Sequence, residues 1–430
     1  MNRLYIYAPI TSSRLQYICN FIFKELMHID FSIINKIEEF EKYNGIKINY
    51  SDEVINNEHF TIGNIGLLFE NGIAQQKIDC FETIGYKAFF KTENSDFPFD
   101  IFSSTFYLLS RYEEYLPHTK DEYGRYAHTH SLAFKENFLS LPLINIWVKD
   151  FAAQIKNKFS LFTFHFSPFT FIPTYDIDIA FSYKHKGLLR NIGGFLKKPS
   201  LNRIKVLLGL QKDPFDTYDY LDKLHEEYHL KALYFFLVAQ KNSAYDKNIL
   251  PHKNIIQKLI LRHAKKYDIG LHPSWQSGDD LLLLKKEKGQ LEAISGLPIT
   301  KSRQHYIRFN LPEGYRKLID AGITEDYSMG YGSINGFRAS VASSFYWYDL
   351  ENERETGLRI HPFCFMEANA FYEQKLTAEQ AYGEMMHYFA ACKNVGGQMI
   401  TIWHNNIFGT DCEFKGWKEK YEQFIVQVLQ

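Results

Sequence analysis

The feature that most constrains the fold is a regular alternation of strand-like and helix-like segments in the second half of the chain. Seven short, apolar, β-prone segments follow one another there, at residues 171–178, 232–239, 268–274, 303–309, 325–331, 358–365 and 399–405. Segments with helical apolar spacing separate most of them, at residues 216–229, 253–267, 279–294, 312–321 and 377–393. Strands that alternate with helices predict a parallel sheet. About seven such units close into a barrel more naturally than they spread as an open sheet.

The residues before this alternation show a mixed pattern. It predicts strands at residues 4–8, 47–51 and 65–70 and helices at residues 13–27, 99–117 and 142–159. A chain of 430 residues is longer than one ordinary domain. We therefore predict an α/β protein with a smaller N-terminal α/β domain at residues 1–160 and a barrel domain at residues 168–430. The sequence indicates no role for the N-terminal domain.

The overall charge argues against two classes of partner. The formal net charge is -1 and the pI is about 7.0, so the overall balance predicts neither a nucleic-acid-binding nor a membrane-attracted surface. Short basic runs at residues 184–187 and 196–199 are interpreted as solvated loops.

The cysteines and the apolar runs bear on the compartment. Five cysteines are widely scattered and never spaced as C-x-x-C, which argues against a disulfide framework or a zinc ribbon and suits a reducing compartment. The first residues lack the apolar region and cleavage site of a signal peptide, and the apolar runs are too short to cross a bilayer. We expect a soluble, cytoplasmic protein without a transmembrane segment.

Polar side chains gather at the ends of the predicted strands. They are Asp176, Asp178, His272 and His404 and, less regularly, Arg303, His305 and Asp326. The C-terminal face of a βα barrel carries its active site, so these residues form a candidate site. Asp176 and Asp178 share one face of an extended strand, where each carboxylate raises the pKa of the other unless a cation intervenes. This D-x-D pattern fits a metal site, the acid–base pair of a glycosidase, or a turn feature without chemistry.

Five short segments at these positions resemble the motifs of the polysaccharide deacetylase family, the NodB-homology domain of carbohydrate esterases. They are Thr174–Asp178 for T-F-D-D, His272–Gln276 for H-x-x-x-H, Arg303–Tyr306 for R-x-P-aromatic, Asp326 for a motif centred on aspartate, and Ile402–His404 for L-x-H. Residues 106–126 also resemble a module that precedes such domains in some bacteria. The resemblance implies a distorted (β/α)7 barrel that removes N-acetyl groups from a sugar or glycan.

The resemblance implies a divalent metal, with zinc as the expected ion, held by Asp178 and His272. The chain departs from the family at the second metal histidine, where it has Gln276, a neutral and weaker ligand. Three outcomes stay open. Asp178 and His272 bind the metal weakly with waters, His305 from the neighbouring strand completes the site, or the site is degraded and binds glycans without cutting them.

The resemblance also implies catalytic roles. Asp176 is the general base and Arg303 orients its carboxylate. The backbone N–H of Tyr306 helps to stabilise the oxyanion. His404 is the general acid that protonates the departing amine, and Asp326 is a candidate for holding it.

Aromatic and basic side chains near these motifs are candidates for substrate binding. Trp275 and Trp403 stand beside the two key histidines, and Arg338 is a candidate contact for an anionic group. Two alternatives to a deacetylase remain. One is a glycan-binding relative without activity, and the other is a glycosyltransferase that uses D-x-D for a nucleotide-sugar metal, which leaves Arg303 and His404 without roles. The expected partner is an N-acetylated sugar or glycan, and the sequence does not predict an oligomeric state.

Overall fold

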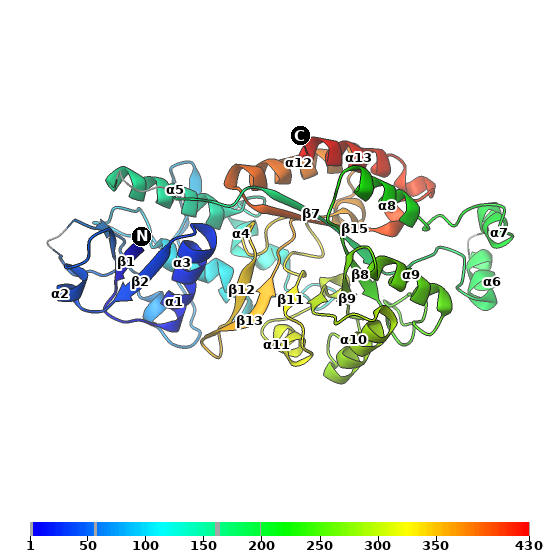
Figure 1. Cartoon of the computed structure of the whole chain (residues 1–430), viewed down its shortest axis with the longest axis horizontal. Coiled ribbons are helices and arrows are strands. Elements are labelled where there is room, and N and C mark those ends of the chain that lie inside the picture. Colours follow the sequence, from blue (N-terminus) through cyan, green and yellow to red (C-terminus); the bar gives the residue numbers. More distant parts are fainter. Residues whose placement is uncertain (1–2, 56–57, 160–163, 198, 430) are drawn as a thin grey trace.

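Two sheets of mainly parallel strands organise the chain, one in each half (Figure 1). The computed structural model describes residues 3–55, 58–159, 164–197 and 199–429. The predicted boundary at residue 160 lies outside these described residues, and the division into domains stays a prediction. Residues 3–159 are called the N-terminal part below, and residues 164–429 the C-terminal part. Among the described helices, none combines the length and the apolar composition needed to cross a membrane.

The N-terminal part is built on a parallel sheet with the strand order β2-β1-β3-β4. Its strands are β1 (Arg3–Tyr7), β2 (Asp30–Ile34), β3 (Ile46–Asn49) and β4 (Phe60–Thr61), with a separate hairpin of β5 (Phe81–Thr83) and β6 (Tyr86–Ala88). Its helices are α1 (Ser13–Cys19), which continues as a π-helix over Asn20–Leu26, α2 (Ile37–Phe40), α3 (Ile101–Leu109), α4 (Leu132–Lys135) and α5 (Leu143–Lys158). The predicted strand at residues 65–70 is wrong. Gly66 has a φ of 89°, which ends any extended run, and a 3₁₀ turn over Leu67–Phe69 follows it.

The C-terminal part is built on a nine-stranded sheet with the order β12-β13-β11-β10-β9-β8-β7-β15-β14. The strands are β7 (Thr170–Ile177), β8 (Leu233–Leu237), β9 (Asp268–His272), β10 (Lys301–Ser302), β11 (Glu325–Asp326), β12 (Phe345–Asp349), β13 (Arg354–Ile360), β14 (Phe365–Met366) and β15 (Gln398–His404). All neighbours pair in parallel except β12 and β13. No pairing joins β14 to β12 within the described residues, so the barrel is distorted and open at this seam.

Helices alternate with these strands as the sequence pattern predicts. They are α6 (Leu188–Lys197), α7 (Leu201–Leu207), α8 (Tyr218–Glu227), α9 (Asn254–Ala264), α10 (Leu281–Ser295), α11 (Glu313–Asp320), α12 (Ala378–Val395) and α13 (Trp417–Val428). The predicted α/β fold with a distorted barrel is confirmed. The details differ in several places. The predicted strand at 303–309 is wrong, because β10 ends at Ser302 and a 3₁₀ turn with a positive φ at Tyr306 covers His305–Ile307. The predicted strand at 325–331 is limited to the two residues of β11. The predicted strand at 358–365 is divided between β13 and β14, and the antiparallel edge strand β12 was not predicted.

The strand register brings the candidate residues to one end of the barrel. Parallel pairing places His404 of β15 opposite Asp176 of β7, and His272 of β9 opposite Leu237 of β8. Since the carboxyl ends of parallel strands meet at the same edge, residues far apart in sequence converge there.

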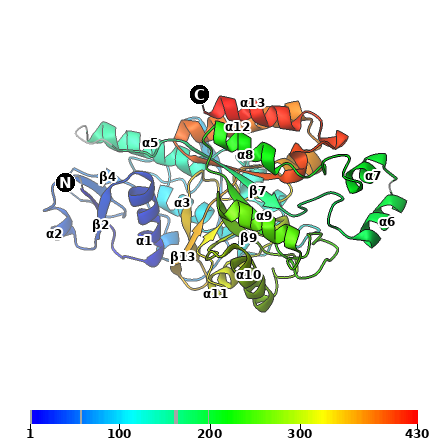
Figure 2. The same cartoon turned by 45° about the vertical axis from the view of Figure 1, so that its right-hand side comes forward.

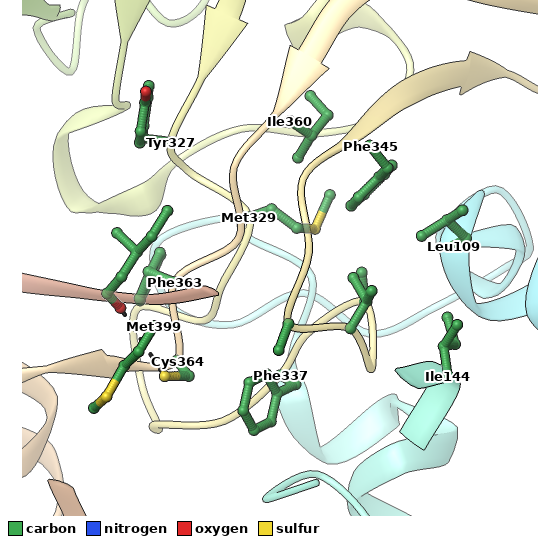
Figure 3. Packing of buried hydrophobic residues seen from close by; sticks show 14 of the residues in the cluster. Leu109, Ile144, Tyr327, Met329, Phe337, Phe345, Ile360, Phe363, Cys364 and Met399 are labelled. Atoms are coloured by element: carbon green, nitrogen blue, oxygen red, sulfur yellow. Dashed lines mark hydrogen bonds between the residues drawn. The ribbon is translucent and has the colours of Figure 1, made fainter. Parts of the chain in front are cut away.

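The two parts share a core. One cluster of buried side chains includes residues of both, such as Leu109 of α3 and Ile144 of α5 together with Phe337 and Phe345 (Figure 3). The backbone N–H of Ile144 also donates to the carbonyl of Ser340 at 3.0 Å. The N-terminal part is thus packed against the barrel rather than tethered to it.

A buried charge network crosses the same contact. Glu114 of the N-terminal part accepts hydrogen bonds from Arg111 Nε at 2.8 Å and from Arg338 Nε and Nη2 at 2.8 and 2.5 Å. All three side chains are buried. Burial alone would raise the pKa of Glu114, but the two guanidinium groups lower it to about 2. The carboxylate is therefore charged and neutralises Arg338 within the core.

We predict that Glu114→Gln lowers the free energy of unfolding by about 3–5 kcal/mol, because it leaves a guanidinium group buried without its counter-charge. Chemical denaturation of the full chain measures this change. Glu122→Gln is the matched control, since Glu122 is exposed, and it should change stability by less than about 0.5 kcal/mol. Equal effects of the two substitutions would contradict the structural role of the network.

Candidate metal and catalytic site

A pocket of about 540 Å³ opens at the carboxyl ends of the barrel strands. Its walls come from the strand ends, from the loops that follow them and from the N-terminal part. The lining residues include Tyr123, Arg125, Asp176, Asp178, His272, His305, Tyr306, Glu367 and His404. A concave site with convergent polar groups is the expected form of a small-ligand or catalytic site.

Three of these side chains form a possible metal-binding group. One ligand atom each of Asp178, His272 and His305 lies within 4.8 Å of the other two. Asp178 Oδ1 is 3.1 Å from His272 Nε2, and Asp178 Oδ2 is 3.3 Å from His305 Nε2. Two imidazoles and a carboxylate are the donor set that zinc favours in catalytic sites. In addition, Asp178 Oδ1 is buried and accepts no hydrogen bond, which fits an atom that serves as a metal ligand.

The second ring nitrogen of each histidine fixes which atom faces Asp178. His272 Nδ1 contacts the carbonyl oxygen of Arg303 at 2.6 Å, and His305 Nδ1 contacts Asp246 Oδ1 at 3.1 Å. Because these oxygens can only accept, both Nδ1 atoms carry the hydrogen, and each Nε2 atom faces Asp178 and offers a lone pair when its ring is neutral. Outer partners of this kind orient metal-binding histidines.

Asp246 is the hub of this outer layer. Besides His305, its carboxylate accepts hydrogen bonds from the backbone N–H of Trp275 at 2.9 Å and from Gln276 Nε2 at 3.1 Å. Burial would raise the pKa of Asp246, but the contacts to His305, Trp275 and Gln276 lower it to about 2. The carboxylate is charged and stabilises His305 in the tautomer described above.

Asp176 lies beside the metal-binding group and is held by Arg303. Arg303 Nη1 donates to Asp176 Oδ1 at 2.9 Å and to Thr174 Oγ1 at 2.7 Å. The other oxygen, Asp176 Oδ2, is 3.9 Å from His272 Nε2. Arg303 is fully buried and lies over the ring of Phe235 at 4.5 Å. The guanidinium group thus fixes one carboxylate oxygen and leaves the other turned toward the donor set.

His404 approaches Asp178 from β15. His404 Nε2 is 3.4 Å from Asp178 Oδ2, and His404 Nδ1 is 2.6 Å from Glu367 Oε1. Glu367 Oε1 also accepts from the backbone N–H of His404 at 3.0 Å. Burial would lower the pKa of His404, but Glu367 and Asp178 raise it well above its ordinary value. The charged form of the imidazole is therefore favoured, and His404 lines the pocket.

The charges of these groups reinforce one another around Asp178. Burial would raise the pKa of Asp178, but His305, His272 and His404 lower it well below its ordinary value. Burial likewise opposes a charge on His305, yet Asp178 and Asp246 raise its pKa to about 9. The site is thus one buried carboxylate surrounded by three histidine rings, and a divalent cation can supply positive charge at this place.

Tyr306 has an unusual backbone that the N-terminal part stabilises. Tyr306 and Ile307 have φ angles of 59° and 54°, a region that bulky and β-branched residues rarely adopt. Arg125 Nη1 donates to the carbonyl of Tyr306 at 2.7 Å. The centroid of the Tyr306 ring lies 5.4 Å from that of the Tyr123 ring. A side chain at Gly332 would clash with Arg125, since a Cβ there would lie 1.9 Å from Nη1.

Two of the predicted site residues have other partners. Gln276 is not among the described residues that line the pocket, and its amide donates to Asp246, so it is not placed as a metal ligand. Asp326 accepts from Ser302 Oγ at 2.8 Å and from Ser328 Oγ at 2.9 Å, not from His404. The strand order explains this, because four strands lie between β11 and β15. Glu367, and not Asp326, contacts His404.

The predicted substrate contacts also need correction. Trp403 is fully buried and packs against Tyr421 of α13, because neighbouring residues on β15 face opposite sides of the sheet. Arg338 is buried against Glu114 and does not reach the pocket. Trp275 stacks on Tyr245 at 3.8 Å and packs edge-on against Tyr306, so it supports the wall from behind.

Sequence reasoning missed several residues of the site. Glu367 follows a predicted strand directly, so the same strand-end signal that marked His404 could have found it. Asp246 lies nine residues beyond the end of β8, within a loop, and no periodicity marks it. Tyr123 and Arg125 come from the N-terminal part, and their position depends on packing between the two parts.

The chain is similar to one protein family over its N-terminal part and to several solved structures. A family of unknown function (DUF7033) matches residues 4–160, and no curated protein matches the chain. Among solved structures, a putative polysaccharide deacetylase from Mycobacterium smegmatis is similar at 14% identity and a TM-score of 0.41, covering 61% of this chain and 84% of its own. A probable polysaccharide deacetylase from Pseudomonas aeruginosa PAO1 is similar at 11% identity and a TM-score of 0.37, with coverages of 60% and 84%. The polysaccharide deacetylase Bc1974 from Bacillus cereus is similar at 11% identity and a TM-score of 0.30, covering 60% of this chain and 87% of its own.

We predict that His305→Ala lowers the affinity for Zn²⁺ by more than about a hundredfold, a larger loss than removal of an outer partner causes. Titration against a coloured chelator measures the affinity without any need for activity. Gln276→Ala is the control and should stay close to the wild-type affinity. The reverse order of effects would show that Gln276, not His305, completes the ligand set.

Proposed function

We propose that this protein is a metal-dependent hydrolase that removes N-acetyl groups from an N-acetylated sugar or glycan. One observation carries the proposal. Asp178, His272 and His305 converge on one point of the pocket, with Asp176 and His404 on either side. The motif resemblance to polysaccharide deacetylases supports the same chemistry, because it assigns a base to Asp176 and an acid to His404.

A divalent cation at Asp178, His272 and His305, with zinc as the ion that this donor set favours, would polarise the acetyl carbonyl and activate a water. Asp176 accepts the proton of that water at Oδ2, since Arg303 engages the other oxygen. The attacking oxygen bonds to the carbonyl carbon, and the backbone N–H of Tyr306 stabilises the oxyanion that develops.

His404 completes the reaction on the other side of the pocket. Its Nδ1 is held by Glu367, so Nε2 delivers a proton to the amine nitrogen as the carbon–nitrogen bond breaks. The products are acetate and the free amino sugar. The raised pKa of His404 fits this role, because an acid must be protonated before it acts.

We predict that Asp176→Asn abolishes acetate release from N-acetylglucosamine oligomers while the bound metal stays, whereas Asp178→Asn loses the metal as well. Elemental measurement on purified protein and an acetate assay, with and without chelator, give the two readouts. Full metal content and full activity in both variants would refute these roles.

We also predict that Glu367→Gln lowers kcat for the amide substrate by about 10²–10⁴-fold, the usual contribution of a positioned acid. Hydrolysis of an aryl acetate should fall much less, since a phenolate leaves without protonation. Both rates are measured in the same metal-loaded preparations.

Glu325→Gln is the matched control for this experiment. It breaks another glutamate–histidine pair, Glu325 with His361 at 3.1 Å, which does not line the pocket. This variant should keep kcat for both substrates. An equal loss for the aryl ester in Glu367→Gln would show that Glu367 only maintains the structure.

A further inference from the structure

A helical segment stands apart from the barrel at the rim of the pocket. It comprises residues 179–212, contains α6 and α7, and is called the rim segment below. Figures 1 and 2 both show these two helices projecting beyond the body of the protein, at the end opposite the N-terminal sheet. The segment leaves β7 immediately after the two aspartates and returns to α8.

The rim segment exposes large apolar side chains where a helix normally buries them. Amphipathic helices of globular proteins turn their apolar stripe to the core. In α7 only Val206 is buried, whereas its other apolar side chains, Leu201, Ile204 and Leu207, are exposed. The exposed ones, with their exposed fractions, are Ile192 (47%), Leu196 (76%), Leu201 (75%), Ile204 (41%), Leu207 (47%), Leu208 (68%) and Leu210 (75%). A concentration of exposed apolar side chains of this size marks an interaction surface.

The same segment is strongly basic. It contains eight of the chain's 49 Lys and Arg residues and none of its 50 Asp and Glu residues. The basic residues are Lys184, Lys186, Arg190, Lys197, Lys198, Arg203, Lys205 and Lys212. The formal net charge of -1 for the whole chain does not reveal this local excess of basic residues. The runs at 184–187 and 196–199, interpreted above as solvated loops, both belong to this segment of the sequence.

The base of the rim segment is fixed next to the pocket. The buried carboxylate of Asp213 accepts hydrogen bonds from the backbone N–H groups of Ser182, Tyr183 and Lys184 at 2.7–2.9 Å. Ile179 at its beginning and Phe215 just after its end both line the pocket. The two helices are therefore anchored through a base that lies beside the pocket.

We propose that the rim segment docks on the surface of an anionic lipid bilayer. Leucine-rich helices with Lys and Arg beside the apolar positions lie in the interface between headgroups and acyl chains, and basic residues near anionic headgroups strengthen such binding. α6 and α7 have 10 and 7 residues, too short to cross a hydrocarbon core of about 30 Å at about 1.5 Å per residue. They lie on the bilayer and do not span it.

A second copy of the chain fits this surface less well. In a symmetric dimer through the rim segment, the same patch of each copy would meet the other. That contact would bring eight basic residues of each copy together without an acidic partner from the segment. An anionic bilayer instead offers acyl chains that can bury the leucines and anionic headgroups that attract the basic side chains.

If the proposed deacetylase function holds, docking of this surface also narrows the substrate class. The pocket opening then lies at the membrane, which suits an N-acetylated sugar attached to a membrane lipid. Binding to vesicles does not require activity, so a failure of docking and a failure of the proposed chemistry are separate results.

The test is flotation of the full-length protein with vesicles of phosphatidylcholine alone or mixed with phosphatidylglycerol. We expect binding to the anionic vesicles at low salt that weakens as salt rises. The double substitution Leu196→Asp and Leu208→Asp should weaken this binding by about a hundredfold or more, since two inserted leucines are replaced by anions. Lys205→Glu should weaken it by about tenfold.

Matched controls are available on α10, which is remote in sequence from the rim segment. Leu282→Asp, at a leucine that is 80% exposed, and Lys285→Glu should bind vesicles like the wild type. Absence of binding to anionic vesicles at low salt would overturn the proposal. So would binding that the leucine substitutions leave unchanged, or a dimer in sedimentation that these substitutions dissolve.

Discussion

The structure of the site depends on one buried carboxylate, Asp178, and on the positive charge that surrounds it. Three imidazoles direct Nε2 at its two oxygens, and each imidazole is held through Nδ1 by an oxygen that can only accept. An isolated buried carboxylate would be costly, but one that is ringed by potential cations or bound to a metal is stable. The carbonyl of Arg303, the carboxylate of Asp246 and the carboxylate of Glu367 are therefore as necessary to the geometry as the histidines are.

The proposed metal-binding group differs from the family motif at one position. At the position where the family motif places a second metal histidine, Gln276 turns away to donate to Asp246. Asp246 in turn holds His305, which stands where the motif usually has proline and presents Nε2 to Asp178. Asp246 thus contacts both the glutamine at the motif position and the histidine that faces Asp178.

The sequence predicted the parts of this arrangement that depend on regular structure. The spacing of Asp176 and Asp178 on one strand, and the strand-end positions of His272 and His404, follow from apolar alternation and from the parallel sheet. Contacts formed between loops could not be predicted in this way, which is why Asp246 was missed. Trp403 was wrongly interpreted as a substrate contact, because neighbouring residues on a strand face opposite sides of the sheet. Although His404 enters the pocket from β15, its neighbour points to α13. The charge of the rim segment was hidden because an average over the whole chain cancels it.

Arg125 joins the two parts of the chain at the pocket. Its guanidinium group reaches from the N-terminal part to the carbonyl of Tyr306, where the barrel backbone has two consecutive positive φ angles. The barrel alone therefore does not enclose the whole pocket. An excised barrel would lose the wall that Tyr123 and Arg125 form, while the aspartates and histidines at the strand ends would keep their places.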